Sequence, residues 1–149
     1  MKGSYIIKVH NHRVTFTLEI ERNITVICGN SATGKTTLID SIAAYEEYGD
    51  KSGVVIDSLK VCRTLHGRNW YDDLLTITDS FVFIDEGNSF ISSEEFAAAI
   101  RGTDNYYIFV TRENLYQLPY SIESVLELHK TTSRFKHTYN RTFPKYDRI

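Results

Sequence analysis

The residues with the clearest chemistry form one octapeptide, Gly29-Asn30-Ser31-Ala32-Thr33-Gly34-Lys35-Thr36. This segment fits the G-x-x-x-x-G-K-[ST] pattern at every fixed position. Its glycines let the backbone turn so that successive N–H groups point inward at phosphate oxygens. Lys35 places a positive charge at the β- and γ-phosphates, and the Thr36 hydroxyl can ligate Mg²⁺. The sequence therefore predicts that residues 29–37, with Thr37 included, bind ATP or GTP with magnesium, and we expect ATP.

Two adjacent carboxylates follow an apolar run later in the chain. Phe81 to Ile84 are all apolar, and Asp85 and Glu86 come directly after them. Alternation along a strand points neighbouring side chains in different directions, so one carboxylate can face a metal and the other a γ-phosphate. We expect Asp85 to support the magnesium ion and Glu86 to be the catalytic base that activates water.

A polar residue, Thr111, follows the next apolar run, Tyr106 to Val110. Thr111 has two interpretations, a simple strand cap or, as the resemblance of these motifs to P-loop ATPases implies, a catalytic group that senses the γ-phosphate. The next residue, Arg112, is either an arginine finger or a surface charge. The sequence leaves both questions open.

The segments around these residues alternate between strand and helix patterns. Two short runs of alternating polarity, 5–9 and 14–20, predict an N-terminal hairpin. A strand over 23–28, the glycine-rich loop and a helix over 35–48 follow. The segment Ser92-Ser93-Glu94-Glu95 is typical of a helix start, and 124–128 with 135–143 predict a closing hairpin. This order predicts an α/β fold, a three-layer P-loop NTPase with a mostly parallel central sheet, in a single domain over 1–149.

The combination of Lys35 in its glycine-rich loop with Asp85-Glu86 after apolar residues resembles the additional-strand catalytic-glutamate division of P-loop ATPases. The N-terminal hairpin, with Ile24 to Ile27 and the loop, resembles ATP-binding heads of the SMC, RecF and ABC type. The resemblance implies nucleotide hydrolysis, with Glu86, Lys35 and Thr111 as its catalytic residues.

The C-terminal half resembles a second group, the zonula-occludens-toxin-like phage assembly ATPases and their DNA-pumping relatives. This similarity rests on three segments, Phe83 to Glu86, Tyr107 to Arg112, and Leu118 to Ile122. It implies an ATPase from a phage or mobile element that acts on a partner.

Charge and composition limit the kinds of partner that the protein can have. The formal net charge is -2 over 149 residues, which gives no general attraction to nucleic acid. The segment 129–149 is different, because it carries six Lys or Arg against one acid, interleaved with aromatic residues. We expect a protein partner or self-association, and the basic segment leaves nucleic acid open as a partner. No apolar run is long enough for a membrane helix, and the two cysteines fit a reducing cytoplasm.

Three functions are consistent with these residues. The first is a magnesium-dependent ATPase whose hydrolysis drives a partner. The second is a small-molecule or nucleotide kinase, in which Arg63, Arg68 or Arg101 would clamp a second substrate. The third is a binding module that responds to nucleotide and hydrolyses it slowly.

Overall fold

The computed structural model describes residues 3–29, 34–111, 118–132 and 136–145. Within them, the helices are α1 (Lys35–Tyr48), α2 (Trp70–Leu75) and α3 (Glu94–Arg101), with short 3₁₀ helices η2 (Gly49–Ser52) and η3 (Ser89–Ser92). The strands are β1 (Tyr5–His10), β2 (Val14–Ile20), β3 (Ile24–Cys28), β4 (Val55–Asp57), β5 (Val61–Thr64), β6 (Ser80–Asp85), β7 (Tyr106–Val110), β8 (Ser124–Thr132) and β9 (Thr138–Pro144).

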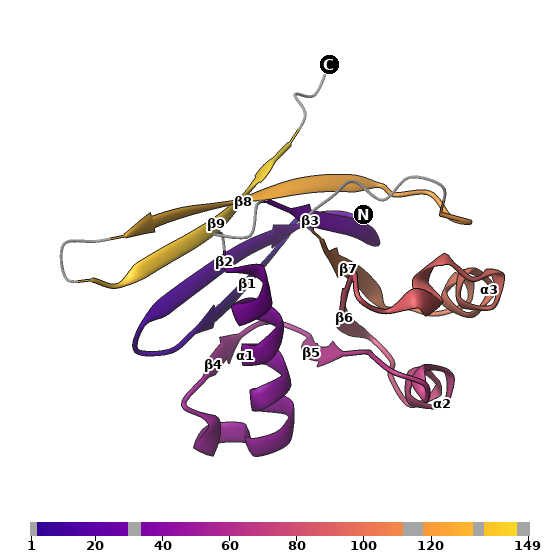
Figure 1. The fold of residues 1–149 in the computed structure, drawn as a ribbon, viewed down its shortest axis with the longest axis horizontal. Helices are drawn as coiled ribbons and strands as arrows, with labels where there is room; N and C mark the ends of the chain where they lie inside the picture. Colours follow the sequence, from indigo (N-terminus) through magenta and orange to yellow (C-terminus); the bar gives the residue numbers. More distant parts are fainter. Residues whose placement is uncertain (1–2, 30–33, 112–117, 133–135, 146–149) are drawn as a thin grey trace.

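All nine strands belong to one sheet, in the order β4-β1-β2-β9-β8-β3-β7-β6-β5 (Figure 1). The five strands from β8 to β5 run parallel to one another. The pairs β1–β2, β1–β4 and β8–β9 are antiparallel, whereas β2 and β9 are parallel. The sheet is therefore mixed, and both hairpins are part of it.

The sheet curls until its two edges approach each other. Its edge strands, β4 and β5, are joined by only residues 58–60, and α1 contacts both of them. Figure 1 shows α1 beside these two short strands. Because consecutive short strands form the two opposite edges, the sheet is close to a closed barrel.

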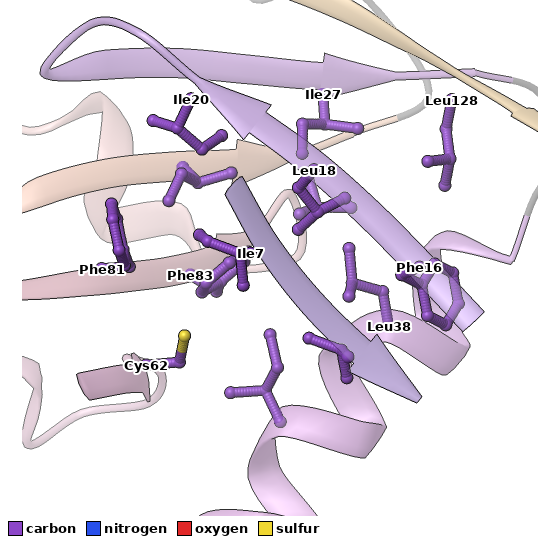
Figure 2. Packing of buried hydrophobic residues seen from close by; sticks show 14 of the residues in the cluster. Ile7, Phe16, Leu18, Ile20, Ile27, Leu38, Cys62, Phe81, Phe83 and Leu128 are labelled. Atoms are coloured by element: carbon purple, nitrogen blue, oxygen red, sulfur yellow. The ribbon is translucent and has the colours of Figure 1, made fainter. Parts of the chain in front are cut away.

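The main core lies inside this curl. Ile7 of β1 and Leu18 of β2 belong to the same buried cluster as Phe83 of β6 and Leu38 of α1 (Figure 2). A second cluster on the other face lies under α2 and α3 and includes Phe96 and Phe109. The inner face of the parallel strands is thus covered largely by the N-terminal hairpin of the same sheet.

This arrangement corrects the fold that the sequence predicts. The expected three-layer α/β fold with a mostly parallel central sheet is wrong, because the protein is dominated by one mixed, nearly closed sheet with few helices. The resemblances to the additional-strand catalytic-glutamate ATPases, to SMC, RecF and ABC heads and to zonula-occludens-toxin-like ATPases fail for the same reason. The physical cause is that the N-terminal hairpin, whose strands alternate between apolar and polar residues, covers the inner apolar face of the parallel strands. The sequence predicts a layer of helices there.

Local signals in the sequence placed several elements well. Ser93 caps α3, because its hydroxyl accepts a hydrogen bond from the Phe96 amide at 3.0 Å. The short strand β5 lies in a stretch whose sequence pattern is ambiguous. No helix in the described residues is long and apolar enough to cross a membrane.

Candidate functional site

The glycine-rich loop joins β3 to α1 at the carboxyl end of the parallel strands. Gly29 follows β3 directly, and Gly34 occupies the N-cap position of α1. The four residues between them, Asn30 to Thr33, lie outside the described residues. The first amides of α1 and its helix dipole favour a negative charge at this end of the helix.

Gly34 has a backbone conformation that favours glycine. Its φ of +89° lies in the left-handed region. A Cβ atom at this position would lie 3.1 Å from Nδ2 of Asn140 and 3.5 Å from the Phe16 ring. Side chains of β9 and β2 therefore pack closely against Gly34.

The Lys35 side chain turns back along its own loop. It is only 7% exposed, and its Nζ donates a hydrogen bond to the Gly29 carbonyl oxygen at 2.5 Å. An ammonium group has three donors, and this bond uses one of them to hold Nζ beside Gly29. The charge of Lys35 thus lies between the end of β3 and the start of α1, where the sequence predicts the phosphate site.

The ends of β3, β7 and β6 lie side by side, because these strands are neighbours in the sheet. Thr111 follows the middle strand, is buried, and donates its amide to the Ile27 carbonyl at 2.9 Å. The Glu86 amide donates to the Val110 carbonyl at 3.2 Å. These bonds fix the backbone of Thr111 against β3 and the backbone of Glu86 against β7.

Asp85 ends β6 and is exposed. Its Oδ1 accepts hydrogen bonds from the Gly87 amide at 2.8 Å and from Asn88 Nδ2 at 3.1 Å. Its Oδ2 has no hydrogen-bond partner within the described part of the chain. The tight turn therefore orients the carboxylate and leaves one oxygen for a further ligand.

A cavity of about 520 Å³ brings most of the predicted site together. It is lined by Lys35, Thr36, Ile39, Asp40, Asp85, Glu86, Gly87 and Val110. The predicted phosphate lysine, both metal ligands and the predicted base thus share one cavity. Thr37 and Thr111 do not line it, although Thr111 follows the lining residue Val110.

Magnesium fits this cavity by the chemistry of its oxygen donors. The Thr36 hydroxyl and the Asp85 carboxylate both line it, and Mg²⁺ is usually held by one or two protein oxygens together with phosphates and water. No cluster of three or more His, Cys, Asp or Glu suited to a metal occurs in the ranges that the structure describes. A metal here would therefore depend on the nucleotide for several of its ligands.

Sequence reasoning missed two polar residues at this site. Asp40 lies four residues after Thr36 on α1, and this helical spacing could have indicated that both face one cavity. Asn140 comes from β9, is 2% exposed, and its Oδ1 has no hydrogen-bond partner among the residues that the structure describes. No local pattern links Asn140 to the loop, because the contact depends on how the sheet curls.

The residues proposed for a kinase lie elsewhere. Arg63 pairs with Glu46, with 2.8 Å between its Nε and the Glu46 Oε2, and neither Arg68 nor Arg101 lines the cavity. Arg112, the other arginine considered, lies outside the described residues.

Cys28, the last residue of β3, is not suited to act as a nucleophile. It is 2% exposed, and burial raises the pKa of its thiol. We therefore assign Cys28 to the core beneath the loop.

Comparison with models of known protein families and with curated protein sequences gives no match.

Proposed function

We propose that this protein binds a nucleoside triphosphate with magnesium, ATP being the nucleotide we favour, and hydrolyses it. The observation that carries the proposal is the shared cavity of Lys35, Thr36, Asp85 and Glu86. Each residue type has a distinct task there, and they come from two places in the fold, the start of α1 and the end of β6.

Binding depends on the loop and the start of α1. Lys35 donates to the phosphates, and the helix amides add further donors. The Thr36 hydroxyl and the Asp85 carboxylate would hold magnesium, which supplies charge neutralisation on the phosphates when it is bound. The bonds from Gly87 and Asn88 to Asp85 Oδ1 keep its carboxylate in place.

Hydrolysis depends on Glu86. Its backbone is anchored to β7, and its side chain lines the cavity that holds Lys35. A carboxylate in this position can accept a proton from the attacking water. Thr111, at the end of the intervening strand, is the group we expect to respond to the γ-phosphate.

The alternatives are less well supported. A kinase needs cations for its second substrate, and none of the arginines considered for that role lines the cavity. We place the activity in the cytoplasm, where nucleoside triphosphates are available and thiols such as Cys28 and Cys62 stay reduced. We also expect a partner or self-association to use the energy of hydrolysis.

The decisive experiment separates binding from chemistry. Glu86→Gln keeps the shape of the residue but removes the base, so ATP binding should persist while turnover falls by about a hundredfold. The matched control is Glu95→Gln, which changes an exposed carboxylate on α3. Calorimetry measures binding and phosphate release measures turnover. Wild-type turnover in Glu86→Gln would refute its role, and absence of ATP binding by the wild-type protein would refute the proposal.

A further inference from the structure

The outer face of strands β1, β2, β9 and β8 carries an ordered row of polar side chains. Lys8 is paired with Thr17, Thr17 with Arg141, and Arg141 with His129. Directly paired residues point to the same face of a sheet. Phe16, which precedes Thr17, is fully buried, so the row faces away from the core.

Two exposed aromatic rings flank this row on β9. Tyr139 is 50% exposed and Phe143 is 42% exposed, and both lie two residues from Arg141. At about 3.4 Å per residue, each ring lies roughly 7 Å along the strand from the arginine. His137 packs against Tyr139, and His129 against Phe143, each with ring centroids 4.8 Å apart. The rings are thus supported by neighbours yet remain open to a ligand.

The charge is positive around Tyr139 and mixed around Phe143, because Glu127 is paired with Phe143 across the strands and hydrogen-bonds to His129. Neither 8–18 nor 128–145, which supply most of this end of the sheet, contains Asp or Glu, whereas Asp57 of the neighbouring strand β4 is paired with Lys8. The described cations in them are Lys8, Arg13, Lys130, Lys136, Arg141 and Lys145. Within the described residues, Lys8 and Arg141 make no ion pair. In a protein of net charge -2, this concentration points to an anionic partner.

We propose that this outer face, called the aromatic–basic face, binds single-stranded nucleic acid. Arg141 and Lys8 contact phosphates, while Tyr139 and Phe143 stack on bases. A single strand is favoured because its unpaired bases offer open ring faces, whereas a duplex hides them. The contacts read no sequence, because flat stacking and phosphate pairing suit every base.

The face is connected to the nucleotide cavity through β9. Asn140 lies between Tyr139 and Arg141 but points inward, where it contacts the position of Gly34. Nucleic acid on one side of β9 and nucleotide on the other therefore act on the same short strand. Binding of nucleic acid to this face does not depend on the proposed function. Only the idea that ATP hydrolysis acts on the bound nucleic acid rests on it.

The test is binding of a fluorescent oligothymidylate to the full chain at low salt, without nucleotide. Tyr139→Ala and Phe143→Ala should each weaken binding by roughly fivefold to a hundredfold. The double variant Lys8→Gln with Arg141→Gln should reduce the slope of log affinity against log salt by about 1.4, or about 0.7 per contact. Added oligothymidylate should also raise ATP turnover of the wild type.

Matched controls lie away from the face. Tyr71→Ala changes a ring that is 51% exposed on α2, and Arg101→Gln an exposed cation on α3. Both should bind oligothymidylate as the wild type does. Equal losses in these controls, no binding at low salt, or tighter binding to duplex DNA or to anionic vesicles would overturn the inference.

The two proposals fail separately. Binding of oligothymidylate without nucleotide should survive Glu86→Gln, because that residue lies in the other site. If turnover depends on Glu86 but no oligothymidylate binds, only the inference about nucleic acid is wrong. If the face binds but the protein does not bind ATP, the proposed activity is wrong.

Discussion

Replacing Gly34 by alanine tests how the loop is seated. The substitution lowers the free energy of unfolding in two ways, through backbone strain and through a close contact with Asn140. A φ of +89° costs an L-residue about 1–2 kcal/mol. The new Cβ would also lie 3.1 Å from Nδ2 of Asn140, whose side chain is buried and has little room to move.

Gly53 provides a control for the first cost. Its φ is +79°, and a Cβ there would meet nothing within 4 Å. Gly53→Ala should therefore lower the free energy of unfolding by about 1–2 kcal/mol from backbone strain alone. Gly34→Ala should lower it by about 1–3 kcal/mol more, the usual cost of overpacking.

The measurement is urea denaturation of both variants, followed by the double variant Gly34→Ala with Asn140→Ala. Removing the Asn140 amide should recover the extra cost of the contact but leave the backbone strain. Equal destabilisation by Gly34→Ala and Gly53→Ala would refute the close packing of β9 on the loop. A double variant that is simply additive would refute it as well.

Three further predictions concern the site and the core. Lys35→Ala should weaken ATP binding by roughly tenfold to a hundredfold, because a charge-assisted hydrogen bond is lost, and calorimetry beside the exposed control Lys51→Ala measures this. Asp85→Asn should raise the magnesium concentration needed for half-maximal turnover; an unchanged requirement would exclude it as a ligand. Burial raises the pKa of the Cys62 thiol from 9.0 to about 11. Since the unfolded thiol ionises first as the pH rises, the free energy of unfolding should fall between pH 9 and 11, by up to about 2–3 kcal/mol from this group. Cys62→Ala should show a shallower fall, measured by denaturation at each pH.

The sequence by itself identified the local parts of the site. The spacing of Gly29, Gly34 and Lys35 predicts a turn followed by a helix, because glycine permits the turn and apolar periodicity defines α1. Four apolar residues before Asp85 and Glu86 predict a buried strand with both carboxylates at its end. These signals are local, so neighbouring residues suffice to read them. The chemical roles remain predictions.

Only the tertiary structure decided which surfaces meet. Alternating polarity shows that β2 has one apolar face, but it does not say which strand or helix that face covers. The hairpin packs over the parallel strands, so a nearly closed mixed sheet replaces the expected helical layer. The same curl brings Asn140, from the far end of the chain, against Gly34 and places Arg141 beside Thr17. Such contacts depend on the pairing of distant strands, and no pattern within one segment encodes them.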